Sequence, residues 1–324
     1  MDAPWISNHQ DVKVLDCTIR DGGLVNDHRF KDDFVKAVYQ CCVAAGVDSM
    51  EIGYKNSDKF FSRDKMGPWK FCNEDDIRRV VDTNPTPLKL VCMMDAGKSD
   101  WKNELLPKDK SVLDIIRVAF YAHQVDEALE MIKGAYDNGY KVSANLMAVT
   151  AVEEPELDRV LEKIAQSETS IIVIVDSFGS LIPEQTAYLT KKYVRFASAT
   201  GKVVGMHAHN NQQLAFANTI EAIRNGALRV DASICGLGRG AGNCPMELIL
   251  PYMRNPKYKV RPVFECMEKE FLALRNEIEW GPYPEFNITG QFNEHPRSAI
   301  GARASDEKDH YVAFYDKMKE TTGK

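Results

Sequence analysis

The chain has 324 residues, of which 44% are hydrophobic and 27% charged, an ordinary composition for a folded globular protein that argues against disorder. A formal net charge of −6 without a basic patch argues against nucleic acid or an anionic membrane as a partner. No apolar run could span a bilayer, and residues 1–13 do not resemble a secretory leader, so we expect a cytoplasmic protein. The eight cysteines contain no Cys-x-x-Cys pair, which favours free thiols.

Short apolar segments recur at intervals of roughly 20 to 35 residues, as expected for repeated βα units. Several are apolar throughout, which is typical of parallel strands buried on both faces. Eight such strands predict a closed (β/α)₈ barrel, the TIM-barrel architecture. The expected strands are Val12–Thr18, Ser49–Tyr54, Leu88–Met94, Ile115–Tyr121, Lys141–Met147, Ile171–Asp176, Lys202–Ala208 and Arg229–Ile234.

Amphipathic patterns between these strands predict the outer helices. The third unit is the weakest, because residues 95–113 contain a glycine, a proline and little helical pattern, so its helix is expected to be reduced. The expected helices are Lys31–Ala45, Glu74–Asp82, Gln124–Asn138, Glu154–Gln166, Pro183–Ala199, Gln212–Asn225 and Pro245–Met253.

About 70 residues follow the eighth strand. They contain an expected helix at Val263–Ile278, an aromatic and proline-rich passage, and a final helical segment at Ser305–Lys324. Because no flexible linker separates them from the barrel, we predict a barrel domain at residues 1–255 and a C-terminal helical extension at residues 256–324.

His207 and His209 form a His-x-His pair at the end of the seventh expected strand. Side chains at i and i+2 of a strand project to the same face, so the two imidazoles can chelate one metal ion. The alternative is a pair of histidines in an ordinary hydrogen-bond network. The residues at the other strand ends decide between the two, because catalytic groups of a barrel come from the carboxyl ends of several strands.

Polar side chains end most of the expected strands. Arg20 and Asp21 follow the first strand, and one carboxylate with two imidazoles leaves a divalent cation with open coordination positions, as a catalytic metal requires. Taken alone, Arg20 and Asp21 could equally form an ion pair in a loop. Further polar groups at strand ends are Glu51, Tyr54, Tyr121, His123, Asn145 and Asp176.

A loop with four alternating glycines, residues 236–243, follows the eighth strand. Its backbone can approach a ligand closely, and Arg239 adds a charge suited to a carboxylate. A dinucleotide site is disfavoured, because that motif belongs to the first βα turn of a doubly wound sheet.

Three motifs in this order resemble the DRE-TIM metallolyases: Arg-Asp-Gly at 20–22, His-x-His-Asn at 207–210 and the glycine loop ending in Asn243. This superfamily includes 4-hydroxy-2-oxovalerate aldolase, 3-hydroxy-3-methylglutaryl-CoA lyase and isopropylmalate or homocitrate synthase. The segments VDASICGLGRGAGNCPMELIL and RVAFYAHQVDEAL are most similar to the hydroxy-oxovalerate aldolases.

The resemblance implies roles for several residues. Asp21, His207 and His209 would bind a divalent metal, with Asn243 as a further ligand; Mn²⁺ or Mg²⁺ is expected, with Zn²⁺ or Co²⁺ as alternatives. Arg20 would steady the oxygen of a pyruvate enolate. The residues expected to bind substrate are Arg20, Glu51, Tyr121, Asn145 and Arg239.

The chain departs from the family pattern at the general base. In the hydroxy-oxovalerate aldolases that the chain resembles, a histidine soon after Arg-Asp-Gly serves as the base. This chain has Gly23 and Leu24 at that place. His123, at the end of the fourth strand, and His295, in a passage that could fold over the barrel mouth, are the favoured replacements. His28 is expected to cap the first helix with its ring in solvent.

We therefore predict a metal-dependent aldolase that acts on a 2-oxo acid and an aldehyde through a pyruvate enolate. The alternatives are a Claisen-type acyltransferase using an acyl-CoA and a barrel that has lost catalysis and serves as a binding subunit. An acylating aldehyde dehydrogenase partner and a homo-oligomer are further expectations.

Overall fold

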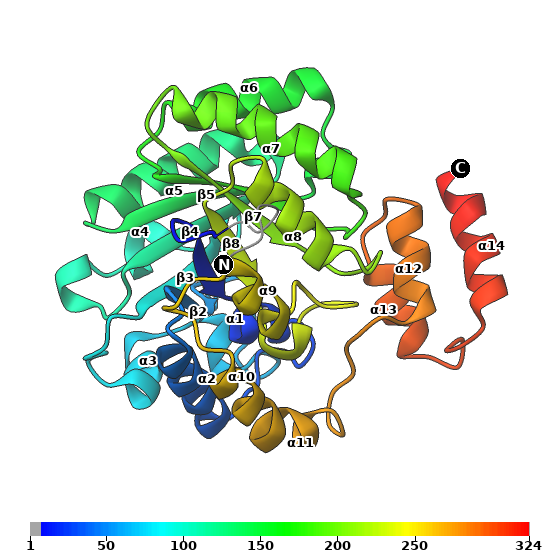
Figure 1. Cartoon of the computed structure of the whole chain (residues 1–324), viewed down its shortest axis with the longest axis horizontal. Helices are drawn as coiled ribbons and strands as arrows, with labels where there is room; N and C mark the ends of the chain where they lie inside the picture. The colour runs from blue at the N-terminus through cyan, green and yellow to red at the C-terminus, as the bar shows by residue number, and fades with distance from the viewer. Residues whose placement is uncertain (1–7, 324) are drawn as a thin grey trace, which may run out of the picture.

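The computed structural model describes residues 8–323. Eight parallel strands close into a barrel in sequence order, with helices around the outside, which confirms the predicted fold class (Figure 1). The strands are β1 Lys13–Asp16, β2 Ser49–Tyr54, β3 Lys89–Asp95, β4 Ile115–Phe120, β5 Lys141–Leu146, β6 Ile171–Asp176, β7 Val203–Ala208 and β8 Arg229–Ala232.

The helices of the barrel agree with the predicted ones except at their ends. The third unit has only a four-residue helix and a 3₁₀ turn at Lys108–Lys110, as its weak pattern predicted. The helices are α1 Thr18–Gly22, α2 Asp32–Ala45, α3 Glu74–Val81, α4 Trp101–Glu104, α5 Val125–Asp137, α6 Glu154–Ala165, α7 Pro183–Ser198, α8 Ala215–Arg224 and α9 Met246–Met253.

The first βα unit differs from the predicted one. Strand β1 ends at Asp16, and Arg20 and Asp21 lie on the short helix α1 instead of a loop. The side chains of Asp16 and Thr18 are both buried, and the Asp16 carboxylate accepts the backbone N–H of Thr18 at 3.2 Å. This local hydrogen bond favours turning the chain after Asp16, directly before α1.

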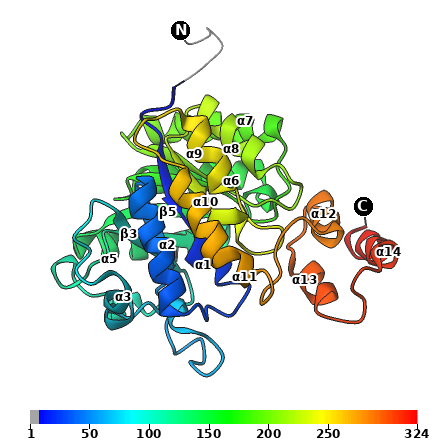
Figure 2. The ribbon, with the colours of Figure 1, turned by 60° about the horizontal axis from the view of Figure 1, so that its bottom comes forward.

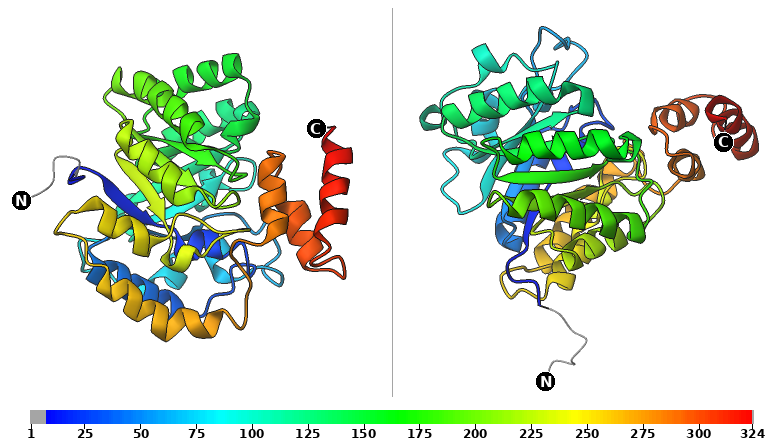
Figure 3. Two further views of the ribbon diagram at one scale, coloured as in Figure 1. Left: turned by 45° about the vertical axis from the view of Figure 1, so that its right-hand side comes forward. Right: turned by 90° about the horizontal axis from the view of Figure 1, so that it is seen from above.

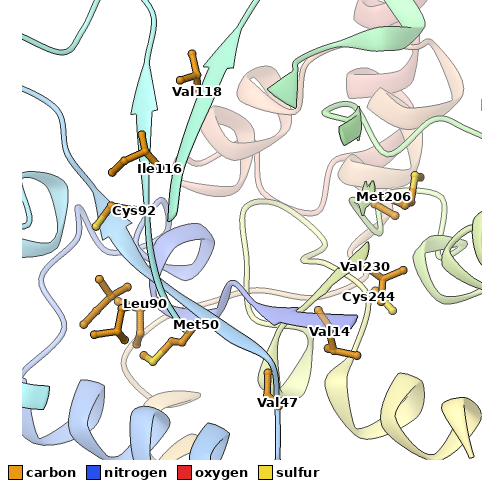
Figure 4. Close-up of a cluster of buried hydrophobic side chains, with 14 of the residues drawn as sticks. Val14, Val47, Met50, Leu90, Cys92, Ile116, Val118, Met206, Val230 and Cys244 are labelled. Atoms are coloured by element: carbon orange, nitrogen blue, oxygen red, sulfur yellow. The ribbon is translucent and has the colours of Figure 1, made fainter. Parts of the chain in front are cut away.

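An apolar layer fills the space between the barrel strands and the helices around them. Figure 4 shows part of it, with Val14, Met50 and Leu90 projecting from neighbouring strands. These side chains belong to one buried cluster that includes Val35 and Val38 of α2. Burying such side chains stabilises the fold by about 1.5 to 3 kcal/mol each.

The interior of the barrel is polar, in contrast to this outer layer. Arg117 of β4 donates to Glu51 of β2 at 3.1 Å and to Asp231 of β8 at 2.6 Å. Asn145 of β5, with its amide oxygen turned toward Arg117, accepts from the same guanidinium at 2.6 Å. Alternate residues of a strand face opposite sides, so the apolar strand sequences carry these charges on their inward positions.

The C-terminal extension begins with α10 Arg261–Cys266, which runs beside α2 and continues through a π-helical turn into α11 Leu272–Leu274 (Figure 2). Then α12 Pro284–Gln291, α13 Arg297–Arg303 and α14 Tyr311–Thr322 stand to one side of the barrel (Figure 3). Phe286, Phe292 and Phe314 join these last helices in a separate cluster. The division after residue 255 stays a prediction.

In the described residues 8–323, no helix is long and apolar enough to cross a membrane. Each of the eight cysteines is a free thiol, as the sequence predicted, and all but Cys235 are buried.

Candidate metal centre

Asp21 of α1 and the two histidines of the His-x-His pair meet at the carboxyl end of the barrel. Oδ2 of Asp21 lies 3.2 Å from Nε2 of His207 and 3.6 Å from Nε2 of His209. All three side chains are buried, and their ligand atoms lie within 4.8 Å of one another. The predicted chelating pair and carboxylate are therefore close enough to hold one divalent metal ion.

Hydrogen bonds orient both imidazoles toward this centre. Nδ1 of His209 lies 3.0 Å from the carbonyl oxygen of Asp176, which can only accept, so Nδ1 carries the proton. Nδ1 of His207 lies 2.9 Å from Oδ2 of Asp231. Nε2 of each ring is directed to the centre, and both Nε2 atoms are buried without a hydrogen-bond partner, as a metal site requires.

Asn243 lies next to the centre, because its backbone pairs with that of His209. Its Nδ2 donates to the carbonyl oxygen of Leu237 at 3.3 Å, while its Oδ1 is buried without a partner. A Cβ atom at Gly238 would lie 2.2 Å from Nδ2 of Asn243 and 3.1 Å from Oδ1 of Asp21. The glycine therefore leaves room for this amide beside the Asp21 carboxylate. Two imidazole nitrogens and a carboxylate form a suitable donor set for a divalent ion; the predicted role of Asn243 as a further ligand stays a prediction.

The charge of Asp21 is stabilised although the side chain is fully buried. Burial alone would raise the pKa of its carboxyl group, but Arg20 and the two imidazoles hold that pKa well below its usual range. The backbone N–H of Arg239 also donates to Oδ1 of Asp21 at 2.9 Å. Burial lowers the pKa of His209 to about 4, so its ring is neutral near pH 7 and can bind a metal.

One nitrogen of the Arg20 guanidinium, Nη2, has no hydrogen-bond acceptor in the described residues. Its Nε donates to Glu51 at 2.6 Å and its Nη1 to Asp21 at 2.6 Å. Nη2 is buried without a partner. Because a buried unsatisfied donor is costly, this NH₂ group is suited to an oxygen of a bound ligand.

Glu51 and Asn145, which we predicted to bind substrate, lie in the interior network with Arg117. Glu51 accepts a hydrogen bond from Nε of Arg20, and the amide oxygen of Asn145 accepts from Arg117. Neither Arg117 nor Asp231 was among the predicted site residues. The signal that could have identified Arg117 was a single charged residue within the otherwise apolar strand IIRVAF. The strand RVDA has charges at two of its four positions, which made Asp231 harder to single out.

Tyr121 and His123 lie apart from the metal-ligand cluster in the contacts of residues 8–323. Their rings stack on each other at 5.8 Å, and the side chain of His123 is exposed. Their predicted roles stay predictions, and no contact with Asp21 or the paired histidines supports them.

His295 folds over the mouth of the barrel, as its passage suggested. Nη1 of Arg239 lies 3.2 Å from Nε2 of His295, and Nη2 of Arg239 donates to the carbonyl oxygen of Ser177 at 2.7 Å. Burial and the charges of Arg239 and Arg297 lower the pKa of His295 to about 3. Arg239 therefore joins the extension to the β6 end of the barrel.

The prediction for His28 was wrong. The residue is 2% exposed, and its ring packs edge-on against Tyr54 with 5.3 Å between the ring centroids. Asp27 and His28 both adopt positive φ angles, of 54° and 61°, which turn the side chain back into the molecule. A Cβ atom at Gly23 would lie 2.2 Å from Nδ1 of His28, so this imidazole fills the space that a side chain at position 23 would occupy.

Comparison with known proteins agrees with this geometry. The profile of a family described as HMGL-like matches residues 11–265. The 4-hydroxy-2-oxovalerate aldolase of Thermus thermophilus is 27% identical over 284 residues, which cover 86% of this chain and 80% of that protein. The oxaloacetate decarboxylase of Mycobacterium tuberculosis is 28% identical over 247 residues, which cover 75% of this chain and 70% of that protein.

Two solved structures show the same architecture. The N-terminal domain of a candidate aldolase from Bacteroides vulgatus aligns with a TM-score of 0.79 at 27% identity, covering 93% of this chain and all of that one. The carboxyl transferase domain of Rhizobium etli pyruvate carboxylase aligns with a TM-score of 0.70 at 17% identity, covering 96% of this chain and 56% of that one. The second similarity shows the fold alone.

Proposed function

Because the chain belongs to the HMGL-like family, we propose that this metal-dependent enzyme is an aldolase that makes or breaks a carbon–carbon bond of a 4-hydroxy-2-oxo acid. The observation that carries the proposal is the set of unsatisfied groups at one point of the barrel mouth. The Nε2 atoms of His207 and His209 and the NH₂ group of Arg20 are buried there without partners.

Asp21, His207, His209 and Asn243 would hold the ion. A divalent ion supplies Lewis-acid polarisation of the 2-oxo acid when bound. We propose Mn²⁺ or Mg²⁺, with Zn²⁺ or Co²⁺ as alternatives.

Arg20 would act on the charge that develops during cleavage. When the C3–C4 bond breaks, the 4-hydroxyl proton leaves, an aldehyde is released and the bonding electron pair stays on the pyruvate fragment as an enolate. The free NH₂ group of Arg20 can donate a hydrogen bond to that oxyanion. Glu51 and Asp21 fix the other two guanidinium nitrogens, so this donor is already oriented.

We propose His28 as the general base, which takes up the 4-hydroxyl proton in cleavage and a methyl proton of pyruvate in the enolisation that begins the reverse reaction. Its imidazole is buried against Tyr54, the ring that Arg20 also faces, and its Nδ1 has no partner. Burial, with the charges of Lys70 and Arg20, holds its pKa well below the usual range, so the ring is neutral near pH 7. The predicted roles of His123 and His295 stay alternatives, although one side chain is exposed and the other already accepts from Arg239.

Decarboxylation of oxaloacetate is the second candidate, because one relative is an oxaloacetate decarboxylase. It yields the same pyruvate enolate, so the same centre could serve both reactions. A Claisen-type acyltransferase is the third candidate and a non-catalytic binding subunit the fourth. An acylating aldehyde dehydrogenase that receives the aldehyde stays a proposed partner.

The test is a pyruvate-forming assay of the metal-loaded protein with a series of 4-hydroxy-2-oxo acids and with oxaloacetate. Pyruvate from the hydroxy acids supports the aldolase, whereas pyruvate from oxaloacetate alone favours the decarboxylase. Release of free thiol from acetyl-CoA in the presence of a 2-oxo acid would instead identify the acyltransferase. No product in any assay would favour the binding subunit.

A further inference from the structure

A buried lysine without an anionic partner packs on Tyr54, the aromatic ring that Arg20 also faces. Lys70 ends the 3₁₀ turn Pro68–Lys70, between β2 and α3, and is 5% exposed. Its Nζ lies 4.2 Å from the centroid of the Tyr54 ring and 4.4 Å from that of Phe61. Among residues 8–323, no group forms an ion pair or hydrogen bond with this ammonium.

Lys192, the other buried lysine of the described chain, shows how the fold satisfies such a charge elsewhere. Its Nζ donates to Asp158 at 2.6 Å and also to Glu154. Burial of a charge is costly unless it is paired, and burial lowers the pKa of Lys70 to about 8, assisted by Lys98 and Arg20 and opposed by Asp95. Lys70 therefore still carries most of its charge at pH 7, without a carboxylate in contact.

Lys70 and Arg20 face the same aromatic ring. The guanidinium carbon of Arg20 lies 5.9 Å from the centroid of Tyr54. The Tyr54 side chain packs with Met93 and Ala119, from β3 and β4, in a small apolar cluster that is separate from the outer core. A ligand with its oxo-acid end at Arg20 could thus extend a few carbon atoms over Tyr54 and reach Nζ of Lys70.

The charges at the two ends of this path differ. Arg20 is already paired with Asp21 and Glu51, whereas the positive charge of Lys70 is not neutralised by contact. We propose that Lys70 binds a carboxylate or phosphate at the far end of the substrate, so that the natural substrate is a 2-oxo acid with a second anionic group. This assignment rests on the proposed function and specifies its substrate class.

Equilibrium binding to the metal-loaded protein tests the proposal without requiring turnover. 2-Oxoadipate and 2-oxohexanoate have the same number of carbon atoms, but only the first has a distal carboxylate. By isothermal titration calorimetry, the wild type should bind 2-oxoadipate about 10- to 100-fold more tightly, the range expected for a charge-assisted hydrogen bond. Lys70→Met should remove this preference.

Lys98→Met is the matched control. Lys98 is exposed and lowers the pKa of Lys70 through its charge, so its loss tests a general field effect without removing the proposed contact. This variant should keep the preference for 2-oxoadipate. Equal affinities in the wild type, no measurable binding of 2-oxoadipate, or an unchanged preference in Lys70→Met would overturn the proposal.

A phosphonate analogue distinguishes the two kinds of anion. 2-Oxo-5-phosphonopentanoate places a phosphate-like group at the far end of the chain. Tighter binding than 2-oxoadipate would identify a phosphorylated substrate, and weaker binding a dicarboxylate. Binding no tighter than that of 2-oxohexanoate, for both anionic probes, would contradict the assignment.

Thermal unfolding separates a ligand-binding lysine from a structural one. Lys70→Met removes an unpaired buried charge and should leave the melting temperature unchanged or higher, whereas Lys192→Met breaks two ion pairs and should lower it. An equal loss of stability in both variants would make Lys70 structural. Binding and turnover together separate this proposal from the proposed function. If the preference for 2-oxoadipate depends on Lys70 but no pyruvate is formed in the assays, the anion site stands and the aldolase proposal fails. If pyruvate is formed but the wild type shows no such preference, the aldolase proposal stands and the anion site fails.

Discussion

His207 and His209 each have one ring nitrogen held by an acceptor and the other directed to Asp21. The pair and its carboxylate could be predicted from the sequence, because a strand places i and i+2 on one face and a barrel brings its strand ends together. The hydrogen bond from His207 to Asp231 could not, because it depends on the register between β7 and β8.

His28 shows a second limit at the residue scale. Its inward position requires two successive non-glycine residues with positive φ, a conformation that is uncommon for such residues. No sequence pattern favoured it. The sequence shows that position 23 has no side chain, but it does not indicate that the imidazole of His28 fills this space.

We expect His209→Ala to lower the metal content of the purified protein at least about tenfold, because even indirect supports of a metal ligand are worth 10- to 100-fold in affinity. The fold should survive, since the replaced nitrogen faces the centre and not the apolar layer. Metal analysis with circular dichroism measures both. His123→Ala, which changes an exposed histidine, should keep its metal; unaltered metal content in His209→Ala would exclude His209 as a ligand.

Arg20→Lys should retain metal but lose turnover by at least about 10²-fold, as when one preorganised oxyanion donor is removed. The planar guanidinium of arginine pairs with Asp21 and Glu51 and still presents a third nitrogen to the ligand. The single ammonium of lysine cannot make all three contacts in that arrangement. Steady-state pyruvate formation and metal analysis of the same sample test this. Near-normal turnover would give Arg20 a structural role only.

His28→Gln should slow proton exchange of pyruvate by about 10²- to 10⁴-fold, the contribution of a positioned base. Glutamine keeps much of the shape of the imidazole but cannot take up the proton. Matched His123→Gln and His295→Gln variants are compared with it by proton NMR. Loss of exchange in either of these, with normal exchange in His28→Gln, would transfer the role to that histidine.

At the scale of elements, the glycine loop at residues 236–243 supports the metal centre through its own tight packing. Gly242 has a φ of +88°, and a Cβ atom there would lie 1.9 Å from the carbonyl oxygen of Gly236. The sequence predicted that the backbone of this loop can closely approach a ligand. In the structure, the backbone at Gly242 closely approaches that at Gly236, within the loop itself. The approach brings Asn243 and the Arg239 N–H to Asp21.

Gly242→Ala should therefore destabilise the protein by more than about 1 kcal/mol, because alanine is strained at positive φ and its methyl group would clash. It should also weaken metal binding, since Asn243 follows directly. Denaturant unfolding and metal titration measure the two effects. Gly201→Ala is a control for positive φ alone, because nothing lies within 4 Å of its Cβ position; equal losses in both variants would show that packing of the loop contributes nothing.

At the scale of the whole molecule, the extension closes one side of the barrel mouth. Nδ2 of Asn293 donates to the carbonyl oxygen of Thr150 at 3.0 Å, and the hydroxyl group of Ser180 donates to Oδ1 of Asn293 at 2.7 Å. His295 meets Arg239 nearby. These contacts lie over β5 to β8, whereas Lys70 and His28 pack against Tyr54 at the end of β2.

The barrel could be predicted almost completely, because eight repeated apolar strands allow few other arrangements. The extension could be predicted only as helical. Helices α12 and α13 have eight and seven residues within an aromatic and proline-rich passage, too short for a clear helical period. Their stability comes from tertiary contacts such as the pairing of Arg303 with Glu285 at 2.9 Å, which no local pattern indicates.

The most direct test of the central claim is exchange of the pyruvate methyl protons with solvent deuterium, followed by proton NMR. It requires the metal centre, Arg20 and a base, but neither the identity of the aldehyde nor a partner protein. The account predicts metal-dependent loss of the methyl signal with the wild type and Mn²⁺ or Mg²⁺, and no loss after chelation or in His209→Ala. Absence of exchange in wild-type protein shown to contain its metal would contradict pyruvate enolisation at this centre.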